Sequence, residues 1–209
     1  MTGDVTALAR DVLEKAGGRD RFMVAIAGPP AGGKSTLSEQ LWAELERLDP
    51  GSSTLVPMDG YHYDDAVLTA SGDLPRKGAP WTFDALGFLA TLERIRAARD
   101  PVAVPVFDRS LELARAGARI VAPDTRIILV EGNYLLLTTP PWHRLRPLFD
   151  HTIMVSAPME VLEARLMERW LGFGFDRESA KTKAGDNDLP NAETVLRDSA
   201  KADVIWTNS

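Results

Sequence analysis

Residues 28–35 read Gly-Pro-Pro-Ala-Gly-Gly-Lys-Ser, which fits the spacing G-x-x-x-x-G-K-[ST] at every required position. An unbroken apolar run of strand length precedes this loop at 22–27, and residues 35–48 follow with leucines along one helical face. Glycines let backbone N–H groups turn towards phosphates, while Lys34 can reach the β- and γ-oxygens and the Ser35 hydroxyl can ligate Mg²⁺. The segment predicts that the chain binds a nucleoside triphosphate, taken as ATP with Mg²⁺. The loop residues expected to contact the nucleotide are Gly28, Ala31, Gly32, Gly33, Lys34, Ser35 and Thr36.

Patterns typical of strands and helices alternate along the whole chain. Strand-like apolar runs lie at 22–27, 53–58, 102–106, 119–122, 127–130, 151–155 and 204–206, and helix-like amphipathic patterns at 5–16, 35–48, 84–99, 159–171 and 192–200. This order predicts an α/β fold of the P-loop NTPase type, a three-layer α/β/α sandwich with a mostly parallel sheet. Pro105 lacks a ladder donor, so its strand is expected at an edge or a strand end. Ligands are expected outside the carboxyl ends of the strands.

Composition limits the classes of protein that this chain can belong to. At 209 residues it is long enough for one substantial core, so residues 1–209 are expected to form a single domain. The formal net charge of −6 argues against general affinity for nucleic acid or anionic membranes. The absence of cysteine excludes disulfides, thiolate zinc sites and a cysteine nucleophile.

The chain also lacks signals for a membrane or for export. No segment approaches 18 consecutive apolar residues, and residues 1–6 lack a basic stretch leading into an apolar run. We therefore expect a cytoplasmic protein without membrane insertion. The oligomeric state stays open, with a homodimer among the options.

Two acidic residues follow predicted strands. Asp59, with Gly60 after it, stands where a carboxylate can take the proton of an attacking hydroxyl, although Asp-Gly is also a common turn. Glu131 follows four large aliphatic residues, as does the acid that presents a carboxylate to Mg²⁺ in P-loop enzymes. His62 is a candidate for substrate contact only through its proximity to Asp59.

Further segments carry a resemblance to a known family. Together with the phosphate loop, the chain resembles the phosphoribulokinase, uridine kinase and pantothenate kinase superfamily of P-loop kinases, and most of all the kinases named for bacterial fructose-type sugar transport. The segments that carry this resemblance are 58–62 (MDGYH), 76–84 (RKGAPWTFD), 105–109 (PVFDR) and 131–137 (EGNYLLL).

The resemblance implies roles for individual residues. Asp59 matches the general base on the acceptor hydroxyl, and Glu131 matches the acid near Mg²⁺; Lys34 completes this catalytic set. The helix after Met159 matches the one that leads into a helical lid, here about residues 165–190, whose arginines neutralise charge on the transferred group. We favour Arg169 over Arg165 as the catalytic phosphate ligand, with Arg177 as a second cation.

The acceptor is implied less sharply. Tyr61, His62, Arg76, Lys77 and Arg109 are the candidate substrate-binding residues, although the three cations also fit ordinary surface charge. The segment after Phe107 lacks the histidine with which uridine kinases read a pyrimidine, and the chain is shorter than the pantothenate kinases. The resemblance to the kinases of fructose-type sugar transport makes a fructose-type sugar the first expectation, and a pantothenate- or nucleoside-type acceptor is the alternative.

A nucleotide-dependent ATPase or switch is the competing class. The chain has no N-K-x-D guanine motif and no L-S-G-G-Q transporter signature, whereas Lys34, Ser35, Asp59 and Glu131 are all present. We therefore expect a kinase acting on a small-molecule hydroxyl acceptor.

Overall fold

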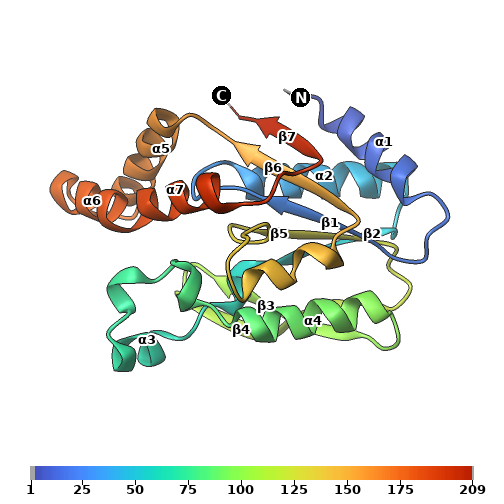
Figure 1. The fold of residues 1–209 in the computed structure, drawn as a ribbon, viewed down its shortest axis with the longest axis horizontal. Helices are drawn as coiled ribbons and strands as arrows, with labels where there is room; N and C mark the ends of the chain where they lie inside the picture. Colours follow the sequence, from blue (N-terminus) through green and yellow to red (C-terminus); the bar gives the residue numbers. More distant parts are fainter. Residues whose placement is uncertain (1–2, 209) are drawn as a thin grey trace.

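The computed structural model describes residues 3–208 and centres on a parallel sheet (Figure 1). Residues 1–2 and residue 209 lie outside this range. The first two belong to residues 1–6, the segment in which the sequence analysis found no export signal. The five strands follow the order β2-β5-β1-β6-β7, and each neighbouring pair is parallel. The strand bounds are β1 (Phe22–Ala27), β2 (Ser53–Pro57), β5 (Ile127–Gly132), β6 (His151–Ser156) and β7 (Val204–Thr207). The expected parallel α/β sheet is confirmed.

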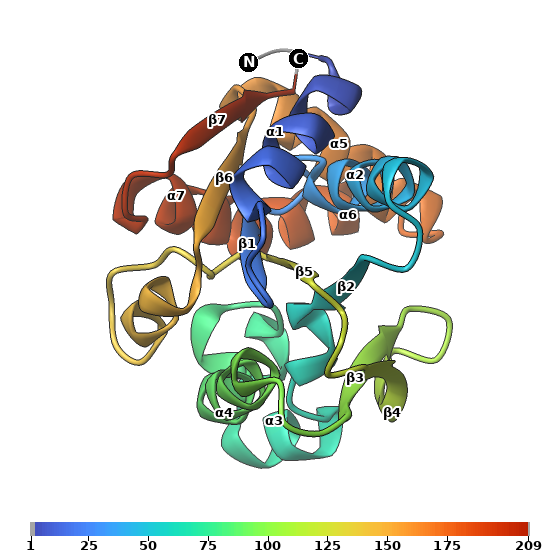
Figure 2. The same cartoon turned by 90° about the vertical axis from the view of Figure 1, so that its right-hand side faces the viewer.

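Helices cover both faces of this sheet, as the sequence predicts. Helices α1 (Val5–Ala16) and α2 (Lys34–Leu48) pack on one face, and α4 (Ala85–Ala97) packs on the other (Figure 2). Every residue of β1 is buried, and its side chains alternate: Phe22, Val24 and Ile26 join the α1–α2 cluster, whereas the intervening residues join the α4 cluster. Burial of a central strand on both faces explains its continuous apolar sequence.

Strands β3 (Val102–Asp108) and β4 (Leu113–Val121) form a separate antiparallel pair outside the main sheet. Both strands are longer than the expected ranges 102–106 and 119–122. The pattern missed most of β4 because that strand is mostly exposed and carries no continuous apolar signal. The pairing shifts register between Val104 and Val106. Pro105 therefore lies at an irregularity, where its missing N–H breaks no regular ladder bond.

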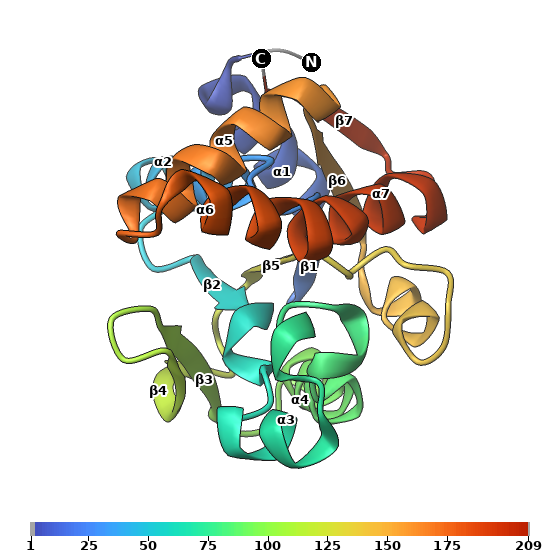
Figure 3. The ribbon, with the colours of Figure 1, turned by 90° about the vertical axis from the view of Figure 1, so that its left-hand side faces the viewer.

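The carboxyl ends of the strands carry most of the remaining helices (Figure 3). Helices α5 (Met159–Gly172), α6 (Arg177–Lys183) and α7 (Leu189–Asp198) lie on one side, and α3 (Asp65–Ser71) lies opposite them. A five-residue π-helical segment, Ala184–Asp188, joins α6 to α7. The sequence pattern missed α3 and α6, which are each only seven residues long. Short 3₁₀ turns lie at Met58–Tyr61, Leu74–Arg76, Pro80–Thr82, Trp142–Arg144 and Arg146–Leu148.

Among residues 3–208, no helix combines the length and the apolar character that a membrane crossing needs.

Candidate active site

The phosphate loop connects β1 to α2 and depends on glycine at the start of the helix. Gly33 precedes α2 with φ 91°, a backbone conformation that residues other than glycine rarely adopt. A Cβ at this position would lie 2.0 Å from Nδ2 of Asn208, the residue after β7. That same Nδ2 donates a hydrogen bond to the Gly32 carbonyl over 3.1 Å. The chain end beyond β7 therefore supports the phosphate loop, a contact between residues 176 positions apart that no local pattern could reveal.

Glu131 meets the phosphate loop because of the sheet register. It lies at the end of β5, opposite Ile26 of β1 and Pro57 of β2. Its Oε1 is 3.6 Å from Lys34 Nζ and accepts a hydrogen bond from Ser35 Oγ over 3.3 Å. Burial raises the pKa of the Glu131 carboxyl, and the neighbouring Lys34 ammonium opposes that rise.

Asp59 lies in the 3₁₀ turn that follows β2. Its Oδ2 accepts a hydrogen bond from Arg109 Nη2 over 2.6 Å, although 55% of the Arg109 side chain is exposed. The turn packs tightly on β3, because a Cβ on Gly60 would lie 2.4 Å from the Pro105 carbonyl oxygen. Glycine at position 60 therefore lets the Asp59 turn approach β3.

His62 follows Asp59 in the same turn and is held by aromatic rings. Its ring centroid lies 3.9 Å from that of Phe83 and 5.0 Å from that of Phe107. Its Nδ1 lies 2.8 Å from the Asp59 carbonyl oxygen. Burial lowers the pKa of His62, against a smaller opposing effect of Asp59. The imidazole is therefore neutral around pH 7.

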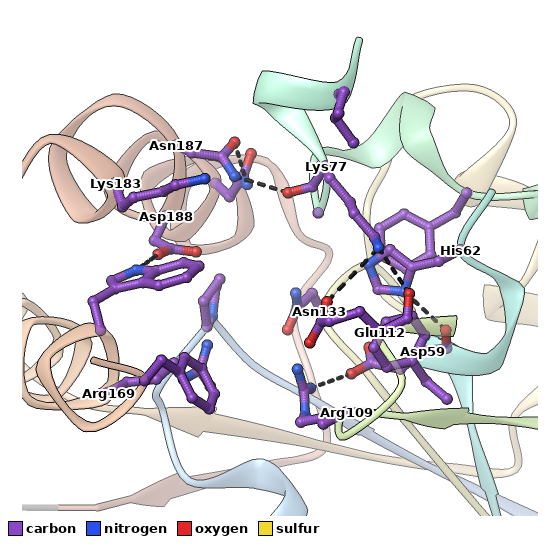
Figure 4. A pocket seen from close by; sticks show the side chains of 18 of the residues that line it. Asp59, His62, Lys77, Arg109, Glu112, Asn133, Arg169, Lys183, Asn187 and Asp188 are labelled. Atoms are coloured by element: carbon purple, nitrogen blue, oxygen red, sulfur yellow. Dashed lines mark hydrogen bonds and ion pairs between the residues drawn. The ribbon is translucent and has the colours of Figure 1, made fainter. Parts of the chain in front are cut away.

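Residues of the predicted lid form the opposite wall, as Figure 4 shows. Trp170 Nε1 donates to Asp188 Oδ2 over 2.7 Å, and Lys183 Nζ lies 5.4 Å from the centre of the Trp170 ring. Arg169 projects from α5 into the same space, and burial lowers its pKa. Asn187 connects the two walls, because its Nδ2 donates to the Lys77 carbonyl over 2.8 Å.

These walls enclose a cavity of about 580 Å³ that the phosphate loop enters from below. Seven predicted residues line it: Lys34, Ser35, Asp59, His62, Lys77, Arg109 and Arg169. Glu131 lies directly behind Lys34 and Ser35. The other lining residues had no predicted role in the site. Pro30, Gly78, Phe83, Phe107 and Asn133 lie within the motif segments, and the rest are Asp65, Leu74, Pro75, Glu112, Trp170, Phe173, Phe175, Lys183, Asn187, Asp188 and Asn191.

Besides Glu131 and the remaining residues of the phosphate loop, three predicted residues lie outside the lining of this cavity. Tyr61 is buried in the α4 core, with its ring centroid 4.7 Å from that of Phe88. Arg76 donates from Nε to Asn187 Oδ1 over 3.1 Å, so it supports the wall from behind. Arg177 is exposed in the first turn of α6. The remaining predicted residues belong to the phosphate loop around Lys34: Gly28, Ala31, Gly32, Gly33 and Thr36. A Cβ on Gly28 would lie 2.7 Å from the Val155 carbonyl oxygen, and one on Gly32 would lie 3.0 Å from the Pro29 carbonyl oxygen.

Comparisons with known proteins agree with this arrangement. No family model matches the chain. The chain is 42% identical to a "putative fructose transport system kinase" from Silicibacter sp. TM1040, with a TM-score of 0.89 over 98% of this chain and 99% of that one. It is 33% identical over 196 residues to a "putative uridine kinase" of Schizosaccharomyces pombe, covering 90% of this chain and 83% of the relative. It is 31% identical over 218 residues to the pantothenate kinase of Limosilactobacillus fermentum, covering 92% and 70%.

All three relatives are named as kinases. The coverage extends over most of both chains, so the likeness is not confined to the nucleotide-binding segment. The chain therefore belongs to the superfamily of P-loop kinases that contains the uridine kinases and the pantothenate kinases, and it is a phosphotransferase with an alcohol group as acceptor.

Proposed function

We propose that this kinase transfers the γ-phosphoryl group of ATP to a hydroxyl group of a sugar or another small polar metabolite, with a fructose-type sugar as the first candidate. One observation carries the proposal: Asp59 lines the same cavity as Lys34 and Ser35 of the phosphate loop. A carboxylate and a phosphate-binding cation that face one space can hold a hydroxyl and a phosphoryl donor together. The high identity to the Silicibacter protein supports a sugar acceptor.

The donor end suits a nucleotide with Mg²⁺. Ser35 Oγ and Glu131 Oε1 adjoin each other, and the buried Oδ1 of Asn133 has no hydrogen-bond partner among the described residues. Within residues 3–208, no cluster of three or more histidine, cysteine or acidic side chains could hold a metal by itself. This fits Mg²⁺, which binds through one or two protein ligands, water and substrate phosphates. When bound, the ion would neutralise charge on the phosphoryl oxygens.

The side chains divide the reaction between them. Asp59 accepts the proton of the acceptor hydroxyl as the hydroxyl oxygen attacks the γ-phosphorus, and the bond from that phosphorus to the bridging β,γ-oxygen breaks, so that ADP leaves. Arg109 holds the Asp59 carboxylate in place. Lys34 at the start of α2 neutralises the phosphate oxygens. Arg169 neutralises the transferred group from the opposite wall, where it lines the cavity. We include about residues 165–190 in a lid that closes over both substrates, with Gly172 and Gly174 as its hinge.

The same relatives suggest a second pair of candidate acceptors, and the need for ATP suggests a cellular compartment. The likeness to a pantothenate kinase and to a uridine kinase makes those acceptors the second candidate. The protein is proposed to work in the cytoplasm, where ATP is available.

Asp59→Asn tests the proposed reaction. The variant should keep ATP binding but lower phosphoryl transfer by at least about a hundredfold, the scale of a lost general base. The assay incubates the protein with ATP, Mg²⁺ and a panel of sugars, sugar acids, nucleosides and pantothenate, and detects new phosphorylated mass. Asp100→Asn, which changes an exposed aspartate outside the cavity lining, is the matched control. Undiminished transfer by Asp59→Asn, or ATP hydrolysis that ignores every acceptor, would overturn the proposal.

A further inference from the structure

Asp59 and His62 stand side by side at the acceptor end of the cavity. Both line it, and they are three residues apart at a 3₁₀ turn whose closing bond runs from the His62 N–H to the Asp59 carbonyl over 3.2 Å. In a 3₁₀ turn, side chains three residues apart lie nearly one above the other. The two side chains therefore present themselves to the same part of the cavity, as Figure 4 shows.

The hydrogen bond of His62 fixes which ring nitrogen carries the proton. Nδ1 lies 2.8 Å from the Asp59 carbonyl oxygen, and a carbonyl oxygen can only accept. Nδ1 is therefore the donor, and Nε2 of the neutral ring keeps a free lone pair. Among residues 3–208, no side-chain hydrogen bond of His62 other than the one through Nδ1 is formed. Phe83 and Phe107 hold the ring, so Nε2 has a fixed direction.

The neighbouring cations are already paired. Lys77 Nζ lies 2.6 Å from Asp65 Oδ1 and 3.7 Å from Glu112 Oε2, and Arg109 is bound to Asp59. An anionic group on the acceptor would have to displace a carboxylate from one of them. A hydroxyl group needs only a free acceptor, which Nε2 supplies. This end of the cavity is therefore built for hydroxyl donors.

We propose that His62 Nε2 accepts a hydrogen bond from a second hydroxyl of the acceptor, next to the hydroxyl that Asp59 deprotonates. The ligand class is a molecule with two neighbouring hydroxyl groups, that is, a vicinal diol or polyol. The inference rests on the proposed function and narrows its acceptor. His62 binds and orients; it transfers no proton.

Matched acceptor pairs test the inference. The pairs are glycerol and propane-1,3-diol, and D-glycerate and 3-hydroxypropanoate. The first member of each pair has a hydroxyl next to a primary hydroxyl, and the second member lacks it. The wild-type protein should favour the first member in kcat/KM by at least about tenfold, because a bound second member covers Nε2 without offering it a hydroxyl.

Two substitutions assign that preference to His62. His62→Phe keeps a flat ring between Phe83 and Phe107 but removes the lone pair, so the preference should fall below about threefold. His62→Gln keeps a hydrogen-bond acceptor and should restore part of the preference. Because each preference is a ratio measured within one variant, partial loss of folded protein does not change it.

The outcomes separate this inference from the proposed function. Equal use of both members of every pair by the wild type would overturn the inference and leave the kinase reaction standing. The same holds if His62→Phe keeps the full preference, or if only pantothenate, whose two hydroxyls are not on neighbouring carbons, is phosphorylated. Absence of transfer to every acceptor, with ATP still hydrolysed, would overturn the proposed function and the inference with it.

Discussion

Removal of the negative charge of Glu131 should destabilise the nucleotide-free protein strongly. Glu131 and Lys34 lie 3.6 Å apart, with only 8% and 10% of their side chains exposed. At an effective dielectric constant of about 20, two unit charges at 3.6 Å attract each other by about 4.6 kcal/mol. Glu131→Gln keeps the shape and leaves Lys34 as a buried, unpaired cation. Loss of one partner from a buried pair costs about 3–5 kcal/mol, so we expect about 3 kcal/mol less free energy of unfolding.

A double-mutant cycle isolates the interaction. Lys34→Met should cost less than Glu131→Gln, because Glu131 has a pKa raised by burial and can become neutral by taking up a proton. The variant with both substitutions carries no buried charge at this place and should lie within about 1 kcal/mol of the wild type. The coupling energy should therefore be at least about 2 kcal/mol.

Urea unfolding at pH 7.5 measures the free energy of unfolding of the wild type, the two single variants and the double variant. Nucleotide and Mg²⁺ are left out because they would change the charge of the site. Far-ultraviolet circular dichroism gives the midpoints and slopes, and equal slopes show that only the free energy changed. A coupling energy below about 0.5 kcal/mol would refute the reasoning. So would a Glu131→Gln variant as stable as the wild type.

Three further predictions concern the loop, the lid and the pH dependence. Asn208→Ala removes the support of Gly32, so steady-state kinetics should show an about three- to tenfold rise in the KM for ATP with a similar kcat. Arg169→Ala should lower kcat by at least about a hundredfold in a transfer assay, whereas Arg99→Ala, an exposed arginine outside the cavity lining, should change kcat less than about threefold. Burial lowers the pKa of His151, so the folded state takes up fewer protons below about pH 6.5 than the unfolded state, and unfolding free energy should fall between about pH 7 and pH 5. Urea titrations of wild type and His151→Gln should show a shallower fall for the variant.

The central elements could be predicted from sequence because their signals are local. The continuous apolar residues of β1 and β5 and the leucine face of α2 define buried elements without any knowledge of their partners. Asp59 and Glu131 were identifiable as strand-end acids for the same reason. The π segment before α7 and residues 113–118 of the exposed strand β4 were not, because π geometry has no simple period and an exposed strand has no apolar alternation.

The sequence by itself therefore determined the donor half: a phosphate loop between a buried strand and a helix, with an acid behind it. That motif is contiguous, so its chemistry can be read from spacing alone. Only the tertiary structure decided the acceptor half. There, the folded chain brings Asp59 and Arg109 opposite the lid residues Arg169 and Trp170, although they are far apart in sequence. The contact of Asn208 with the phosphate loop is likewise a product of the tertiary structure. Such contacts depend on strand order and register, which periodicity in one sequence does not encode.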